Sequence, residues 1–428
     1  MVAAERKPPR FLTAVEHELL PVGTGSGALT PSEADRLAML ARKRPGFCTL
    51  GHRSVRLAQY AGLVNLGGRI LEVLPKVGER VEPAGARRTL LRMLALAHDL
   101  PAFEHDDATH DLRQHSLLDV FVLAYLRSLL PLVRAGLVRR YRSEEADIRV
   151  LRGRLLVSRQ VSAHAMRIDT LACRFDELTP DNRWNQVLKA ALVAVRPWMR
   201  GVGTGRLWLE MSAAFDEVAT PADALLLHST LGRDRQVAHY ASALRWAGWI
   251  LRLLTPGLRA GSSEAPELLF DMNRLFEAAV YGRLRGSARR LGLDLHAQHT
   301  GWHLARAFNE PAARFFHLRP DLVLSQGGTV LAVGDTKWTR LEMDSIGRLV
   351  PRNEHAYQMN AYAAAYGCEE VTLIYPWHEG LEGAHPTLYR LPPAGGREVN
   401  LHVVGVDVGM DGLPFRMVAG DSRLGRLL

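Results

Sequence analysis

The sequence predicts an α/β protein in which a mixed β and α N-terminal region precedes a C-terminal α/β domain with a small central mixed sheet. Short apolar segments broken by glycine occupy residues 46–77, helical periodicity runs from about residue 86 to 254, and strands alternate with helices after residue 266. A chain of 428 residues exceeds one ordinary domain. We therefore predict three segments, which are a β-rich region over 1–85, a largely helical region over 86–255 and the α/β domain over 256–428.

The N-terminal elements have clear local signals. A helix is predicted to begin after Thr30, because Thr30 can cap it, Pro31 suits its first turn and Glu33 completes a capping box. Residues 69–75 are predicted to form a strand that ends at a proline. Apolar residues recur on one face from residue 117 to 130, which indicates a helix.

The C-terminal segment alternates between the two kinds of element. Its pattern predicts a helix over 268–284, a hairpin of residues 321–324 and 329–333 with a glycine turn, a helix over 354–366 and a strand over 371–375.

The net charge of +9 favours a polyanionic partner, because contacts between cations and phosphates dominate affinity for nucleic acids. A solvated basic surface is the alternative. The same two interpretations apply to Arg283, Arg285, Arg289 and Arg290, which lie on or near one predicted helix and could follow a DNA backbone.

The cysteine pattern and the N-terminus indicate a cytoplasmic protein. The three cysteines lie far apart and form no C-x-x-C pair, so neither a zinc ribbon nor a disulfide framework is expected. The first residues lack the apolar stretch of a signal peptide. No uninterrupted apolar run approaches the ~18 residues that span a bilayer, so we expect no membrane partner.

Two carboxylates and a lysine mark the predicted hairpin. Asp321 leads into its first strand, and Asp335-Thr336-Lys337 ends its second. Side chains alternate along a strand, so Asp335 and Lys337 share a face. Carboxylates on adjacent strands can ligate one Mg²⁺, Thr336 can add its backbone carbonyl, and the ammonium can lie beside an attacking water. This pattern predicts phosphodiester hydrolysis, and a salt bridge at a strand end is the alternative.

Two helices offer further candidates. Glu277, in the helix before the hairpin, could turn a third carboxylate toward the metal, or it could be an exposed helix residue. Gln358 and Tyr362, in the helix after it, are four residues apart and share a face. Together they could brace the site or contact a phosphate.

Another acidic and histidine-rich stretch, residues 104–111, has the composition of a metal site. It precedes a predicted helix, so a solvated loop with capping acids is the better interpretation. The glycine-rich run over 23–27 lacks the third glycine of a dinucleotide-binding loop and follows no strand.

The motifs resemble those of a known nuclease superfamily. Pro320-Asp321, Asp335-Thr336-Lys337 and the helix from Gln358 to Tyr362 resemble the PD-(D/E)xK nucleases, in particular the RecB-like branch. Over about residues 45–380 the chain is similar to the McrC family, the nuclease subunits of McrBC modification-dependent restriction systems. Further matching stretches lie at residues 71–76, 136–141, 151–154, 175–185 and 270–277.

The resemblance implies a restriction-endonuclease-like C-terminal domain that depends on Mg²⁺ and cuts DNA. It also implies a partner, a hexameric AAA+ GTPase of the McrB type, whose hydrolysis the N-terminal part stimulates. The sequence agrees that any motor is another chain, because it contains no Gly-Lys dipeptide and hence no Walker A loop. His355 departs from the family, which often has an acidic residue there. A nuclease independent of DNA modification, or a mainly non-catalytic regulator of a motor, remains an alternative.

Overall fold

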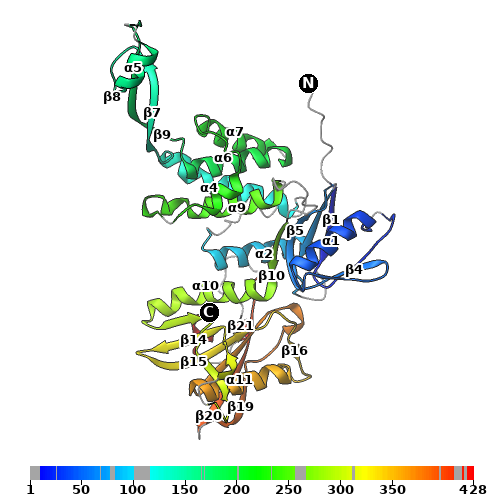
Figure 1. The fold of residues 1–428 in the computed structure, drawn as a ribbon. Coiled ribbons are helices and arrows are strands. Elements are labelled where there is room, and N and C mark those ends of the chain that lie inside the picture. The colour runs from blue at the N-terminus through cyan, green and yellow to red at the C-terminus, as the bar shows by residue number, and fades with distance from the viewer. Residues whose placement is uncertain are drawn as a thin grey trace. The chain divides into compact units, whose positions relative to one another are not determined.

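The structure is a computed structural model that divides into two compact units (Figure 1). Unit 1 contains residues 118–262, and unit 2 contains residues 10–117 and 263–428. The division of the chain into three consecutive domains, which the sequence analysis predicted, stays a prediction. The structure describes residues 10–25, 27–67, 69–77, 82–100, 116–164, 166–167, 169–199, 202–232, 234–255, 267–310, 314–394, 397–408, 417–418 and 422–428. Within these residues, no helix is both long and apolar enough to cross a membrane.

The N-terminal part of unit 2 is built on two small sheets and one capped helix. Thr30 accepts a hydrogen bond from the backbone of Glu33, and the Glu33 carboxylate accepts one from the backbone of Thr30, so the predicted capping box is confirmed. The helix α1 (Pro31–Lys43) packs its apolar face on the strands. The sheets have the orders β1-β6-β5-β10 and β2-β4-β3, with β1 (Arg10–Val15), β2 (Leu19–Pro21), β3 (Cys48–Leu50), β4 (Ser54–Leu57), β5 (Tyr60–Asn65), β6 (Arg69–Leu74) and β10 (Glu267–Asp271).

The strand β10 corrects the prediction of a helix over 268–284. Residues 267–271 pair antiparallel with β5, and the helix α10 begins only at Met272. Asp271 caps that helix, since its carboxylate accepts hydrogen bonds from the backbone amides of Asn273 and Arg274. The pairing needs Gly62, because a Cβ there would lie 2.0 Å from the Leu268 carbonyl oxygen.

Another, larger sheet forms the C-terminal part of unit 2, and it contains the predicted hairpin, which is thereby confirmed. β14 (Leu322–Gln326) and β15 (Thr329–Thr336) pair antiparallel around a turn at Gly327 and Gly328, both with positive φ. β15 and β18 (Glu370–Pro376) then pair in parallel. The strand order is β11-β14-β15-β18-β20-β19, with β21 beside β20; the remaining strands are β11 (Asp294–Ala297), β19 (Thr387–Ala394), β20 (Arg397–Val406) and β21 (Met417–Val418).

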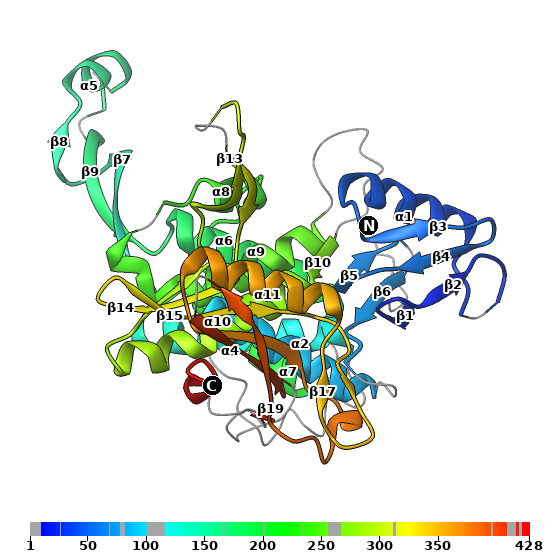
Figure 2. The same ribbon diagram turned by 90° about the horizontal axis from the view of Figure 1, so that it is seen from below.

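Two helices lie on opposite faces of this sheet (Figures 1 and 2). α11 (Asn353–Tyr366) covers the face to which Val333 points and forms a core cluster with it. α10 (Met272–Arg290) contacts β15 on the other side and packs against α2 (Pro83–His98), where a Cβ on Gly282 would lie 2.1 Å from a backbone oxygen. Two short hairpins belong to the same unit: β12 (Trp302–Arg306) pairs with β13 (Arg314–Leu318), and β16 (Glu342–Met343) pairs with β17 (Leu349–Val350). The unit also contains two short 3-10 helices, η3 (Glu379–Leu381) and η4 (Gly425–Leu427).

Unit 1 is largely helical and carries a long β arm (Figure 1). Its helix α4 begins at Leu117, as the sequence predicts, and runs to Ala135. A three-stranded sheet interrupts the helices, and its arm holds β8 and α5 at the end away from α6. The other elements are β7 (Arg140–Ile148), β8 (Arg154–Leu155), α5 (Val157–Ala163), β9 (Leu171–Thr179), α6 (Arg183–Val195), η1 (Arg196–Trp198), α7 (Val202–Ala214), α8 (Ala224–Ser229), η2 (Arg235–Tyr240) and α9 (Ala241–Leu254).

Candidate active site

The strand register brings the two predicted aspartates together. Leu322 of β14 lies opposite Gly334 of β15, so Asp321, one residue earlier, faces Asp335, one residue later. One Asp321 carboxylate oxygen accepts hydrogen bonds from the Thr336 backbone amide at 2.7 Å and from its hydroxyl at 2.6 Å. Thr336 therefore fixes the first aspartate at the end of the hairpin.

Lys337 joins the second aspartate to the helix α11. Its Nζ lies 2.5 Å from the Asp335 carboxylate and donates to the Gln358 Oε1 at 2.8 Å. The Gln358 amide nitrogen donates to the Tyr362 hydroxyl at 2.7 Å, and that hydroxyl in turn bonds to Asp335. The four side chains form a closed ring of polar contacts, which the sequence predicted only as residues on shared faces.

Burial and mutual repulsion raise the pKa values of the acidic side chains in the site. Asp335 is 2 % exposed, and burial followed by the charge of Asp321 raises its pKa from 3.8 to about 6. Burial also raises the pKa of Asp321. Glu277 on α10 has its pKa raised to about 7 by burial and by the charges of Asp321 and Asp335, although a hydrogen bond with Gln298 opposes this rise. Three acidic groups thus act on one another, and the positive charges of Lys337 and Arg319 offset their repulsion only in part.

This charge balance suits a divalent cation. Mg²⁺ takes oxygen ligands, needs only one or two carboxylates and keeps several waters. Asp321 and Asp335 supply such a pair. Among the described residues, no three or more His, Cys, Asp or Glu side chains are arranged to hold a metal. The fit therefore rests on the aspartate pair, while Glu277 and the Thr336 carbonyl as ligands stay predictions.

A further buried carboxylate, Glu16, lies next to the site and gave no sequence signal. The indole of Trp338, the residue after Lys337, donates to Glu16 at 3.1 Å, and its ring lies 5.4 Å from that of Phe276. Burial raises the pKa of Glu16 to about 7. The contact joins β1 to the end of β15 across more than three hundred residues, which no local pattern can reveal.

His355, the departure from the family pattern, lies inside the protein. It is 9 % exposed, and its Nδ1 is 2.8 Å from the Tyr375 hydroxyl. Burial, followed by the charge of Lys337, lowers its pKa. The lowered pKa favours the neutral form of the imidazole at this position.

The other candidates from the sequence lie elsewhere or outside the described residues. Residues 104–111 fall in the part of the chain that the structure does not describe. Arg285 pairs with Asp99, while Arg289 and Arg290 are exposed at the end of α10. Whether these two arginines bind DNA stays a prediction.

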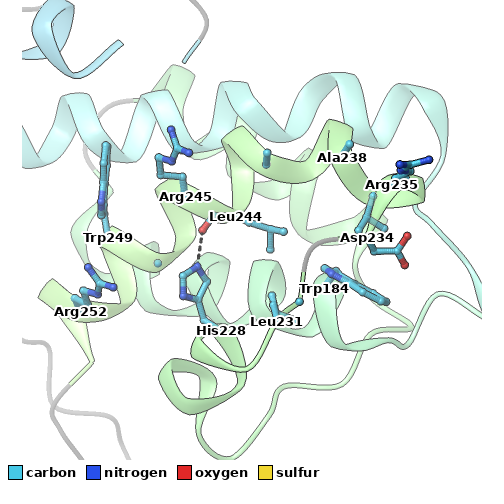
Figure 3. Close-up of a pocket in the computed structure, with 14 residues that line it drawn as sticks. Trp184, His228, Leu231, Asp234, Arg235, Ala238, Leu244, Arg245, Trp249 and Arg252 are labelled. Atoms are coloured by element: carbon cyan, nitrogen blue, oxygen red, sulfur yellow. Dashed lines mark hydrogen bonds between the residues drawn. The ribbon is translucent and has the colours of Figure 1, made fainter. Parts of the chain in front are cut away.

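A pocket of about 760 Å³ opens in unit 1 between α8 and α9 (Figure 3). His228 lies in its middle and bonds to the Leu244 carbonyl oxygen at 3.1 Å. Asp234, the one carboxylate among the lining residues, pairs with Arg140 at 2.6 Å. The pocket thus lacks a pair of carboxylates like that of Asp321 and Asp335.

Comparisons with known proteins agree on one family. The family model for the McrBC 5-methylcytosine restriction system component matches residues 55–376. A solved tetradecameric assembly of Thermococcus gammatolerans McrB AAA+ hexamers with bound McrC contains a chain of similar fold, at TM-score 0.69 and 19% identity, covering 94% of this chain and 97% of that one. A cryo-EM structure of the Thermococcus gammatolerans McrBC complex matches at TM-score 0.51 and 20% identity, covering 65% and 88%. No curated protein matches the chain in sequence.

Proposed function

Since this chain belongs to the family of McrBC 5-methylcytosine restriction system components, we propose that it is the DNA-cleaving subunit of such a system. In this proposal it is a Mg²⁺-dependent endonuclease that acts in assembly with a hexameric AAA+ GTPase of the McrB type and stimulates that partner's GTP hydrolysis. The observation that carries the nuclease part is the pair of the half-buried Asp321 and the buried Asp335 with Lys337 beside it, at adjacent strand ends.

The chemistry of each residue gives it a role in the proposed cleavage reaction. Asp321 and Asp335 would hold Mg²⁺, with the Thr336 carbonyl and Glu277 completing the shell. When bound, the ion would supply positive charge to a phosphate oxygen and to the leaving oxygen. The Lys337 ammonium, held by Asp335 and Gln358, orients the attacking water and offsets charge on the phosphate. Water attacks phosphorus in line, and the bond to the opposite oxygen breaks.

The partner part of the proposal draws on the comparisons and on the arm of unit 1. The similar chains belong to assemblies of McrB with McrC. Exposed apolar side chains gather on the arm, where water-facing hydrophobic groups indicate a contact surface. They are Tyr141, Val150, Leu151, Val157, Val161 and Leu178. This arm lies within residues 86–255, the largely helical segment of the N-terminal part, for which the resemblance implies a role in binding the partner.

The test combines the full chain with an McrB-type AAA+ protein from the same organism, GTP and Mg²⁺, on methylated and unmethylated plasmids. We expect cleavage of the methylated plasmid only in the complete mixture. Asp335→Ala should abolish cleavage and Lys337→Ala should lower its rate by about 10²–10³-fold, and both variants should still bind the partner and stimulate its GTPase. The matched control is Asp344→Ala, which removes an exposed carboxylate paired with Arg348 in the same unit.

Each other outcome selects a different function. Cleavage by the chain alone, without regard to methylation, would indicate a nuclease of an independent repair or defence pathway. Stimulated GTP hydrolysis without cleavage under any condition would indicate a regulator of the motor. Unchanged cleavage by either site variant would refute the assignment of the active site.

A further inference from the structure

The hairpin of β12 and β13, here called the β12–β13 ribbon (residues 302–310 and 314–318), has a composition that the packing at its base does not explain. It forms a two-stranded sheet of its own and rises from the sheet that carries the candidate site (Figure 2). Its large apolar side chains nevertheless face water. They are Trp302 at 45 %, Leu304 at 56 %, Phe308 at 99 %, Phe315 at 50 % and Phe316 at 71 % exposure.

The strands of the ribbon leave consecutive aromatic side chains in water. Phe315 lies opposite Ala305, and Phe316, whose φ is +57°, lies between the paired residues Phe315 and His317. Neither side chain is buried, so neither packs in a core of the described residues. A hairpin of two strands is marginal in water without such a core. Exposed aromatic side chains at this density indicate a binding surface.

The charges on the ribbon identify the kind of partner. The strand register places Arg306 opposite Arg314 and His303 opposite His317. Like charges directly across a strand pair destabilise it, and no carboxylate of the described residues forms an ion pair with either arginine. Burial and then the charges of the two arginines lower the pKa of His303. Two arginines against the one carboxylate of the described ribbon, Glu310, leave a net positive charge among exposed aromatic rings.

The base of the ribbon is joined to the candidate site on two sides. The ring of Trp302 lies 5.3 Å from that of Tyr366, whose hydroxyl is 3.0 Å from the His299 Nδ1. Tyr366 lies one turn after Tyr362 on α11. At the other strand, β13 ends at Leu318, three residues before Asp321. A ligand held by the ribbon is thereby held close to the aspartates.

We propose that the β12–β13 ribbon is a DNA-binding element that enters a groove of the duplex beside the phosphate to be cut. The major groove of B-DNA admits a two-stranded β ribbon. Arg306 and Arg314 contact phosphates on its two sides, and Phe308 at the tip contacts the bases, where apolar side chains serve other DNA-binding proteins as wedges. The inference rests on the proposed function, since it takes DNA as the substrate of the adjacent site.

The first test asks what the tip touches in the working assembly. The three native cysteines are buried, so Phe308→Cys introduces a thiol that a benzophenone maleimide can label selectively. The labelled chain is mixed with the AAA+ partner, GTP and radiolabelled methylated duplex, and is then irradiated. Ile346→Cys, at a position 62 % exposed in the same unit, is the matched control. We expect a crosslink to DNA from position 308 at several times the yield from position 346.

The second test measures the phosphate contacts on the full chain by fluorescence anisotropy with a labelled duplex at several salt concentrations. Arg306→Ala with Arg314→Ala should weaken binding about 10-fold or more and lower the salt slope by about 2, because each phosphate contact contributes about 0.9 to that slope. Arg306→Lys with Arg314→Lys keeps both charges and should keep the slope.

The outcomes separate this inference from the nuclease proposal. Crosslinking of position 308 to the AAA+ protein, or to nothing, would overturn the ribbon as a DNA-binding element even if the wild-type assembly cuts DNA. An unchanged salt slope in the alanine variant would overturn the phosphate contacts. Crosslinking to DNA in an assembly that never cuts would support the ribbon and reject the nuclease.

Discussion

Replacing Asp335 with asparagine should abolish cleavage and, at the same time, stabilise the metal-free protein at neutral pH. Burial and the charge of Asp321 raise the pKa of Asp335 from 3.8 to about 6. The folded protein therefore keeps a proton on this carboxyl between about pH 4 and pH 6, where the unfolded chain has already released it. Wild-type stability falls as the pH rises through this window, and the loss persists above it. Asparagine at this position carries no charge at any pH, so the variant does not lose this stability.

The magnitude follows from the pKa. A rise from 3.8 to about 6 corresponds to roughly 3 kcal/mol of stability lost by the ionised form. The substitution also leaves the Lys337 ammonium without its carboxylate, so the expected net gain at pH 8 is about 1–3 kcal/mol. Below pH 4 the gain should vanish. Mg²⁺ should narrow this difference, because an ion present at ten times its dissociation constant stabilises the wild type by about 1.4 kcal/mol and the variant hardly at all.

The assay is urea unfolding at pH 5 and pH 8, each in EDTA and in MgCl₂. Trp338, next to Lys337, makes fluorescence sensitive to this part of the sheet. Asp344→Asn is the control, because Asp344 pairs with Arg348 at the surface and that pairing lowers its pKa. Its loss should lower stability slightly at pH 8, with no response to Mg²⁺.

One result would refute the reasoning. If Asp335 serves as a structural partner of Lys337, breaking a buried pair should cost the variant about 3–5 kcal/mol even without metal. A strongly destabilised Asp335→Asn at pH 8 in EDTA would therefore reject the metal site as the reason for the buried charge.

Three further predictions concern the site and the fold. Lys337→Ala should reduce the cleavage rate by about 10²–10³-fold, measured on plasmid in the complete assembly, and a loss below 10-fold would contradict its role. Cleavage at low Mg²⁺ should rise as the pH passes about 6, where Asp335 ionises, and more Mg²⁺ should shift this rise to lower pH because the ion competes with the proton. Gly62→Ala should lower the melting temperature by several degrees, because its Cβ would meet the Leu268 carbonyl oxygen at 2.0 Å where φ is +136°. Gly23→Ala, with no atom within 4 Å of its Cβ, should leave the melting temperature nearly unchanged.

Local chemistry explains which parts of the fold could be predicted. The capping box at Thr30 and the turn at Gly327-Gly328 need only neighbouring residues, and both formed as expected. The strand Glu267–Asp271 was mistaken for the start of a helix because a short apolar run fits either structure. Its partner strand β5 lies some two hundred residues earlier, and only that pairing decides between them.

The candidate site divides in the same way. Alternation in β15 placed Asp335 and Lys337 on one face, and the hairpin placed Asp321 near them, so the sequence sufficed for the three central residues. The hydrogen bond from Lys337 to Gln358 depends on how α11 lies across the sheet. The sequence offered those two residues only as separate candidates.

The sequence by itself determined the family, the hairpin and the identity of the acidic and basic groups, because these depend on residue type and on spacing over a few positions. Tertiary structure alone decided how strongly the carboxylates are buried, that Glu16 reaches Trp338, and that the β12–β13 ribbon leaves aromatic side chains in water. Burial and electrostatic coupling depend on which distant segments pack together. The periodicity of apolar residues along one segment does not show which distant segments pack against it.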